Sequence, residues 1–241
     1  MRLDRPATWV LPAAGWADGV TDALASRIAQ QPDLVLCLPT GSTPLPVYER
    51  LPGALARRGA SVEQAAIVLL DEYLGLPPGH PARCDSKLGE HLLDRLLDPP
   101  ARFLPFGVDR ADPVVACAEF DAEIDALGGL DLVVLGLGLN GHIGMNEPGT
   151  TADAATRVVD LTPSTMEAAR GYGADPPPTR GVTLGIEEIL AAREIWLLAT
   201  GDRKAGILAE TLHGPVTSDV PASLLRDHPG LLVMADDAAM P

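Results

Sequence analysis

Four short polar segments contain the residue types best suited to bind an anion and to move protons. They are Thr40–Thr43, Asp71–Tyr73, Gly138–Glu147 and Gly201–Lys204. Each one follows a short apolar run, as expected of a loop at the end of a buried strand. Because ligands of open parallel sheets lie outside the carboxyl ends of the strands, we expect the four segments to meet at one site.

The first segment is suited to holding a phosphate. Gly41 permits a tight turn, and Ser42 and Thr43 bring hydroxyl groups to the start of a helix expected over Leu45–Arg58. The free N–H groups and the dipole at a helix N-terminus favour an anion. Thr43 could equally serve as a simple helix cap, and the segment alone leaves the two interpretations open. It is not a Walker A loop, since no Gly-Lys-Ser/Thr is present.

The second segment places two carboxylates, Asp71 and Glu72, after the apolar run Ala65–Leu70. A carboxylate against an apolar wall has a raised pKa and can act as a base toward a carbon acid. The alternative is that both acids mark the end of the strand and lie in solvent. For an isolated Asp-Glu pair this alternative is the commoner one, so the pair acquires meaning only from the other segments.

The glycine-rich third segment carries His142, whose imidazole is a base near neutral pH. Glu147 lies five residues further on, close enough for the loop to fold back and orient the imidazole. Asn140 could orient it from the other side. A lone histidine is usually structural, but a histidine in a strand-terminal glycine loop with these two neighbours favours a functional role.

The fourth segment carries Lys204, one of only two lysines in the chain, the other being Lys87. Lys204 falls in the first turn of a helix expected over Asp202–Thr211, where a cation opposes the helix dipole. We interpret it as the partner of an anion, with an ordinary surface lysine as the alternative.

The chain as a whole alternates strand-like and helix-like segments. Further strands are expected at Asp33–Leu38, Asp131–Leu137, Thr156–Leu161, Arg180–Leu184, Glu194–Thr200 and Leu231–Ala235, and further helices at Asp18–Gln30, Ser86–Leu97, Asp112–Leu127 and Ile186–Ala192. This order predicts an α/β fold: a single Rossmann-like domain over residues 1–241, with a mainly parallel sheet and helices on both faces.

Composition argues against several partners. A net charge of -15 repels nucleic acid and anionic lipid. No apolar run reaches the roughly 18 residues of a membrane span. Asp4 and Pro6 interrupt the first apolar stretch, so we expect no signal peptide and a cytoplasmic protein. Three scattered cysteines without a CxxC pattern support neither a disulfide framework nor a metal site.

Five segments in the same order resemble the glucosamine-6-phosphate deaminase/isomerase family, within the superfamily that also contains the 6-phosphogluconolactonases. They are LPTGSTPLPVYERL, LDEYLGLPPGHPARCDS, LVVLGLGLNGHIGMNEPG, TRGVTLGIEEILAAREIWLLATGDRKAGILAE and VTSDVPASLLRDHPGLLVMAD. The third and fourth are similar to the galactosamine-6-phosphate deaminase branch.

The resemblance implies deamination and aldose–ketose isomerisation of a glucosamine- or galactosamine-type 6-phosphate, with no cofactor and no metal. Its partner would be this small sugar phosphate, and a homo-oligomer is compatible with it. Asp71 would be the base at carbon, His142 would open the sugar ring, and Glu147, with Asn140 beside it, would assist. The implied substrate-binding residues are Thr40, Gly41, Ser42, Thr43, Glu72, Gly138, Gly141, Arg170 and Lys204.

Two positions depart from the family pattern. Asn140 stands where most relatives have Asp, and Cys84 stands where they often have an aromatic residue. A lactone hydrolase and a non-catalytic sugar-phosphate sensor are the alternatives. The run Asn146–Pro148 favours the deaminase, because lactonases tend to have a Thr-Ala-Ser type run after Gly-His. No basic recognition helix supports a DNA-binding sensor.

Overall fold

A seven-stranded sheet forms the centre of the molecule. The structure, a computed structural model, describes residues 6–110 and 112–240. Every neighbouring pair in this sheet is parallel, in the order β1-β10-β9-β6-β2-β3-β5. The strands are β1 (Ala7–Leu11), β2 (Val35–Leu38), β3 (Ala66–Leu69), β5 (Arg102–Leu104), β6 (Leu132–Gly136), β9 (Glu194–Ala199) and β10 (Leu231–Asp236).

A second, three-stranded antiparallel sheet lies beside the first, in the order β4-β8-β7. Its strands are β4 (Asp71–Tyr73), β7 (Arg157–Asp160) and β8 (Arg180–Thr183). Only Leu70 separates β4 from β3, so the chain passes directly from the large sheet into the small one. Asp71, the first residue of β4, pairs with Thr183.

Alternation along the strands builds two apolar layers, because successive side chains of a strand point to opposite faces. Leu36 and Leu38 of β2 pack into one layer, whereas Val35 and Cys37 pack into the other. Strands buried on both faces need continuous apolar runs, which explains why the interior strands were recognisable in the sequence.

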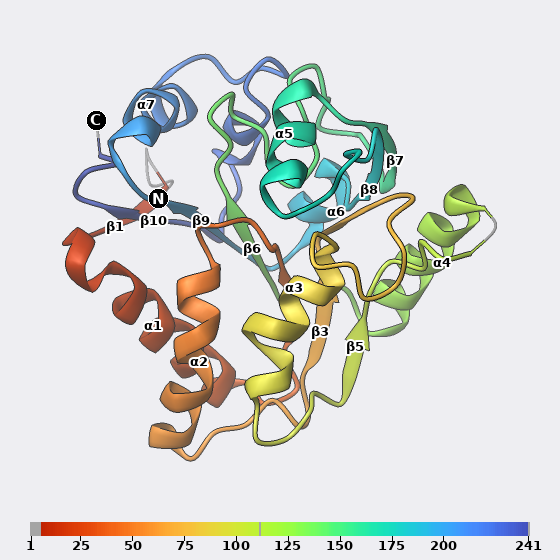
Figure 1. Ribbon diagram of the computed structural model, residues 1–241. Coiled ribbons are helices and arrows are strands. Elements are labelled where there is room, and N and C mark those ends of the chain that lie inside the picture. The colour runs from red at the N-terminus through yellow and green to blue at the C-terminus, as the bar shows by residue number, and fades with distance from the viewer. Residues whose placement is uncertain (1–5, 111, 241) are drawn as a thin grey trace.

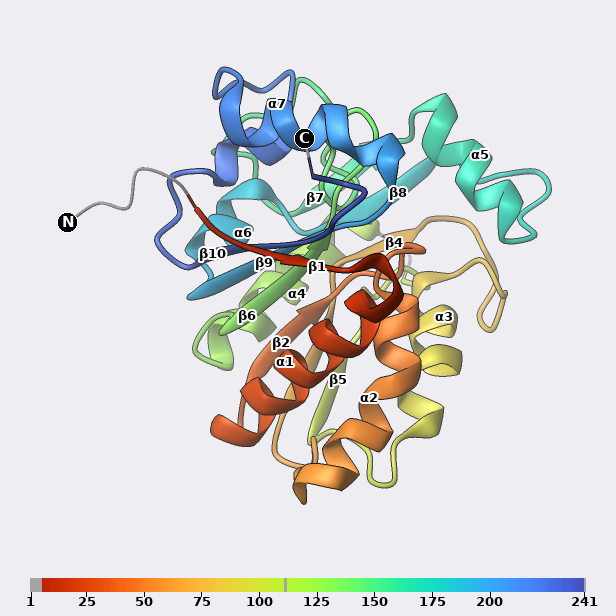
Figure 2. The ribbon, with the colours of Figure 1, turned by 90° about the vertical axis from the view of Figure 1, so that its left-hand side faces the viewer.

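Helices cover both layers, as Figures 1 and 2 show. One layer contains apolar side chains of α1 (Trp16–Gln30), α2 (Leu45–Arg58) and α3 (Cys84–His91). The other contains those of α4 (Pro113–Ala126), α6 (Ile186–Ala191) and α7 (Ala205–His213). A further helix, α5 (Pro163–Gly171), lies beside β7 and β8 in Figure 1. Across residues 6–110 and 112–240, no helix has the length and apolarity to cross a membrane.

The strand order creates a crevice between β2 and β6. From β2 the chain continues to β3 and β5 on one side, whereas from β6 it continues to β9 and β10 on the other. The loops that follow β2 and β6 therefore diverge, which is where open parallel sheets bind their ligands. The predicted α/β fold with a mainly parallel sheet is confirmed.

Several predicted boundaries were wrong. The helix expected over Ser86–Leu97 begins earlier, at Cys84, and gives way after His91 to a 3-10 turn at Leu93–Arg95. The helix expected from Asp202 begins as a 3-10 turn, and α7 proper starts at Ala205. Lys204 therefore occupies the N-cap position of α7.

Four elements were not predicted at all. They are β1, β4, β5 and α5, three of which are strands of five residues or fewer. β1 and β5 are the two edges of the large sheet, where an apolar alternation is weakest. For α5 the sequence did hold a signal, since Thr162 caps the helix and Pro163 occupies its first position.

The sheet interior should tolerate no loss of volume. Leu36 is 1% exposed, whereas Leu97 is 86% exposed. We expect Leu36→Ala to lower the free energy of unfolding by about 2 to 5 kcal/mol, because it leaves a cavity between β2 and the helices. Leu97→Ala, the matched control, should change it by less than about 0.5 kcal/mol. Urea denaturation measures both, and equal effects would contradict this layer assignment.

Candidate active site

A cleft of about 500 Å³ opens at the carboxyl ends of β2, β3 and β6. Its size is in the range of small-molecule sites. Residues from all four polar segments line it, although they lie far apart in the sequence. The residues that were predicted as site residues and that line the cleft are Thr40, Gly41, Ser42, Thr43, Asp71, Gly138, Asn140, His142 and Lys204.

One end of the cleft offers donors for an anion. Helix α2 begins at Leu45, and no side chain caps its N-terminus. Ser42 and Thr43 line the cleft at this end, so the interpretation of Thr43 as a helix cap is not supported. The ammonium of Lys204 donates a hydrogen bond to the carbonyl of Leu137, which fixes its position beside the glycine loop. Burial, together with the charge of Arg203, lowers the pKa of Lys204.

Asp71 is a half-buried carboxylate in the wall of the cleft. Desolvation raises its pKa above the ordinary value. The neighbouring Cys84 thiol and the positive charges of Lys87 and His142 act in the opposite direction. A desolvated carboxylate in this setting is a stronger base than one in water, which suits it to take a proton from carbon.

His142 is held against the main chain of the glycine loop. A Cβ atom on Gly138 would lie 2.5 Å from its ring, so only glycine leaves room for the imidazole there. The Nδ1 atom of His142 is 3.5 Å from Oε2 of Glu147. With Nδ1 directed at a carboxylate, the Nε2 atom remains for proton transfer to a ligand.

Glu147 lies behind His142, outside the residues that line the cleft. Its Oε1 atom accepts hydrogen bonds from the hydroxyls of Thr162 and Thr165, at 3.0 and 2.7 Å. Its Oε2 atom accepts one from the side-chain amide of Asn140 at 2.8 Å. Burial opposes ionisation, but the contacts with His142, Thr165 and Asn140 outweigh it and lower the pKa of Glu147 to about 2.

Asn140 contacts this pair differently from the prediction. Its carbonyl oxygen accepts a hydrogen bond from the main-chain N–H of His142 at 3.2 Å, not from the imidazole. Its amide group donates to Glu147. Asn140 therefore fixes the turn and the carboxylate, and it reaches the ring of His142 only through Glu147.

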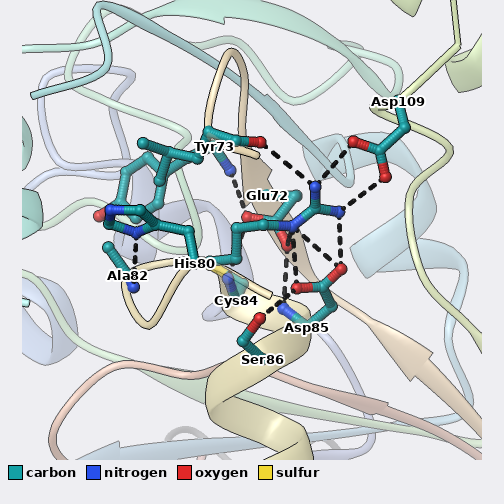
Figure 3. A network of polar contacts seen from close by, with 10 residues as sticks. Glu72, Tyr73, His80, Ala82, Cys84, Asp85, Ser86 and Asp109 are labelled. Carbon is teal, nitrogen blue, oxygen red and sulfur yellow. Dashed lines mark hydrogen bonds and ion pairs between the residues drawn. The ribbon is translucent and has the colours of Figure 1, made fainter. Parts of the chain in front are cut away.

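Glu72 was expected to bind substrate, but it does not line the cleft. Consecutive strand residues point to opposite faces, so Asp71 faces the cleft while Glu72 faces the start of α3. The buried carboxylate of Glu72 accepts main-chain hydrogen bonds from Tyr73, Cys84 and Asp85 at 2.7 to 2.9 Å (Figure 3). Burial raises its pKa to about 7, against these hydrogen bonds.

Arg83 also stabilises the loop between β4 and α3. Its buried guanidinium donates to both carboxylate oxygens of Asp85 and of Asp109, the two acids labelled in Figure 3. It also donates to the main-chain carbonyl of Leu76. The loop between β4 and α3 is therefore tied down at both ends, and this fixes where α3 begins.

The cleft residues that the sequence analysis did not assign to the site include Cys84, Lys87 and Tyr172. Cys84 and Lys87 reach it from α3, and Tyr172 follows α5. The ammonium of Lys87 lies 3.3 Å from the centroid of the Tyr172 ring. The rarity of lysine in this chain was the one available signal for Lys87, since its helix face was not known.

Two residues assigned to substrate binding lie elsewhere. Arg170 is exposed on α5, where it pairs with Glu167 at 3.0 Å, and it does not line the cleft. Gly141 has a φ of +84° and packs against Val220, so it serves the turn of the loop. Gly138, in contrast, does line the cleft.

Residues 12–234 match the sequence family described as glucosamine-6-phosphate isomerases/6-phosphogluconolactonase. The glucosamine-6-phosphate deaminase of Geobacillus sp. (strain WCH70) is 42% identical over 223 residues, which cover 91% of this chain and 88% of the relative. The glucosamine-6-phosphate deaminase of Streptomyces coelicolor is 41% identical over 224 residues, with 91% and 85% covered.

Solved structures show the same relationship. One described as a monomeric glucosamine-6-phosphate deaminase matches with a TM-score of 0.91 at 32% identity, covering 97% of this chain and 98% of that chain. A 6-phosphogluconolactonase from Thermotoga maritima matches with a TM-score of 0.75 at 22% identity, with 95% and 98% covered. At that identity the second likeness shows a shared fold alone.

The depressed pKa of Glu147 makes a prediction about acid stability. A carboxyl group whose folded-state pKa is about 2, against an ordinary 4.5, stabilises the fold above pH 4.5 and loses this contribution as the pH falls toward 2. The contribution is on the order of 3 kcal/mol. In Glu147→Gln, urea denaturation should show a smaller loss of stability across this pH range.

Glu90→Gln is the matched control, because Glu90 is exposed on the surface of α3. Its loss of stability between pH 4.5 and 2 should equal that of the wild type. A Glu147→Gln curve parallel to that of the wild type would show that the hydrogen bonds to this carboxylate do not stabilise its ionised form.

Proposed function

Because the chain belongs to the glucosamine-6-phosphate isomerase/6-phosphogluconolactonase family, we propose that it converts a 2-amino-2-deoxyhexose 6-phosphate into a ketose 6-phosphate and ammonia. The observation that carries this proposal is the meeting of Asp71, His142 and Lys204 in one cleft. Relatives at 41–42% identity along nine-tenths of the chain are glucosamine-6-phosphate deaminases, which supports the same reaction.

In this proposal, the phosphate binds at the uncapped N-terminus of α2. Ser42 and Thr43 would donate hydroxyl and main-chain hydrogen bonds, and Lys204 would contribute a positive charge. The dipole of a 14-residue helix favours a dianion there. Anchoring the substrate by its phosphate places the other end of the sugar toward Asp71 and His142.

Ring opening requires a proton to move from the hydroxyl on C1 to the ring oxygen. An imidazole can both accept and donate a proton, so His142 would carry out this transfer, and Glu147 behind it would stabilise the protonated ring. Thr162, Thr165 and Asn140 hold Glu147 in place. The products of this step are the open-chain aldehyde and the original state of His142.

Isomerisation and loss of ammonia then require a base at C2. Asp71 would take the proton from C2, and the C1–C2 enolamine would take it back at C1, leaving an imine at C2. Water adds to this imine, the C2–N bond breaks, and ammonia and the ketose 6-phosphate result. Desolvation of Asp71 supports this role, because it raises the basicity of the carboxylate.

Three parts of the proposal extend beyond the reaction. We place the protein in the cytoplasm, which its three buried free cysteines support. We take residues 1–241 as a single domain of this family. Assembly into a homo-oligomer stays a prediction.

The assay that tests the function measures ammonia released from glucosamine 6-phosphate and galactosamine 6-phosphate side by side, with 6-phosphogluconolactone hydrolysis as the control reaction. We expect ammonia from at least one amino sugar. Consumption of the lactone alone would show that the chain is an ester hydrolase.

Asp71→Asn should lower kcat for deamination by about 10²- to 10⁴-fold, because the amide cannot accept the C2 proton. The affinity for the sugar phosphate, measured by calorimetry, should remain close to that of the wild type, because the residues that bind the phosphate are intact. Lys204→Met is the complementary variant and should mainly raise KM. Full turnover by Asp71→Asn would refute its role as the base.

Asn140→Asp tests the departure from the family pattern. The new carboxylate would replace the amide that now donates to Glu147 at 2.8 Å, so it adds negative charge beside His142. We expect the pH–rate profile to move to higher pH, because the added charge favours the protonated imidazole. Asn140→Leu removes the hydrogen bonds without adding charge and serves as the control. An unchanged profile for Asn140→Asp would contradict the expectation.

A further inference from the structure

Lys87 presents a buried positive charge that the proposed reaction leaves unused. It projects from α3, is 5% exposed and lines the cleft. Among the residues that the structure describes, its ammonium has no carboxylate within 4.0 Å and no hydrogen-bond acceptor, and its contact is the face of the Tyr172 ring at 3.3 Å. An ammonium in this position gains a cation–π attraction but loses most of its hydration.

A structural role does not account for a lysine at this position. Burial lowers its pKa, which means that the fold disfavours the charge. An apolar side chain of similar length would pack against Tyr172 without that cost. The chain has 16 arginines and two lysines, yet both lysines line the same cleft. Residues that cost stability and sit in a cleft point to function.

Asp71 lines the same cleft as Lys87. The charge of Lys87 lowers the pKa of Asp71, and the charge of Asp71 in turn favours protonated Lys87. The groups that face Asp71 from the packed elements are Cys37 of β2, Tyr48 of α2, Tyr73 of β4, Cys84 and Lys87 of α3, His142 of the glycine loop and Tyr172 after α5. Of these, only Lys87 and His142 can carry a positive charge.

His142 cannot supply a constant charge, because its proposed work is to gain and lose a proton. Lys87 takes no part in that transfer. We propose that Lys87 is a positioning residue: its positive charge, buried in the same cleft, keeps Asp71 ionised and therefore ready to accept the C2 proton. This inference rests on the proposed function, in which Asp71 is the base.

The two lysines thus lie in different parts of the cleft. Lys204 is fixed to the carbonyl of Leu137 beside the proposed phosphate end. Lys87 is placed by α3, whose first N–H groups are bound by Glu72. Because Glu72 and Asp71 are adjacent residues of β4, the carboxylate that fixes α3 also fixes the distance between Lys87 and Asp71.

The pH dependence of kcat/KM for ammonia release tests this assignment. At low pH, kcat/KM should fall as Asp71 becomes protonated; this fall is the acid limb of the profile. In Lys87→Met the acid limb should move up by about one pH unit or more, because a nearby opposite charge lowers the pKa of a carboxyl group by that amount. Lys87→Arg keeps the charge and should restore the limb to its wild-type position. Lys204→Met, the control at the other end, should raise KM and leave the limb in place.

An acid limb at its wild-type pH in folded Lys87→Met would overturn the proposal. The melting temperature separates the roles further: a structural role predicts a lower value for Lys87→Met, whereas the present proposal predicts an equal or higher one. If Lys87→Met does not fold, Lys87→Gln provides a second neutral variant for the same profile.

A titration that needs no turnover keeps this inference distinct from the proposed function. The ¹³C-carboxyl signal of Asp71, assigned by its loss in Asp71→Asn, should titrate at higher pH in Lys87→Met than in the wild type. An unchanged titration would refute the role of Lys87. Absence of ammonia release from the wild type, with this shift present, would refute only the deaminase assignment.

Discussion

The desolvated carboxylate of Glu72 is the constraint on which the cleft depends. It is buried and accepts three main-chain hydrogen bonds, two of which come from the first N–H groups of α3. An unmet donor at a buried helix end would cost more than one in solvent, so this arrangement determines where α3 starts. The same strand presents Asp71 on its opposite side. Of these two adjacent acids, Glu72 therefore fixes the position of α3 in the wall of the cleft, and Asp71 is the group that faces the cleft.

A similar division separates His142 from the groups behind it. His142 lines the cleft, whereas Glu147 lies one layer deeper and is held by hydroxyls at the start of α5 and by Asn140. Those contacts leave the carboxylate ionised and oriented. The residues that would contact a substrate are thus held in position by neighbours that would not contact it. This arrangement keeps the geometry of a site when no ligand is bound.

The sequence was informative where a polar side chain followed a buried strand. Asp71, His142, Ser42 and Lys204 were predicted on that basis, and they line one cleft. The sequence did not show in which direction each side chain points. Adjacency could not show that Glu72 points away from Asp71, because this depends on the register of β4 with β8. Arg170 was misplaced because α5 was not predicted, so its exposed helix face was unknown. Lys87 was missed although its helix was predicted, because the sequence did not show which face of that helix meets the cleft.

The scarcity of lysine has a practical consequence. Apart from the chain terminus, the protein carries two primary amines, and both belong to residues that line the cleft. Reagents that acylate amines, including common fluorescent dyes and surface-coupling chemistries, therefore have the ligand site as their main internal target. Protection of these amines by a bound ligand would report occupancy directly. Attachment through arginine-rich or acidic surface positions leaves the cleft free.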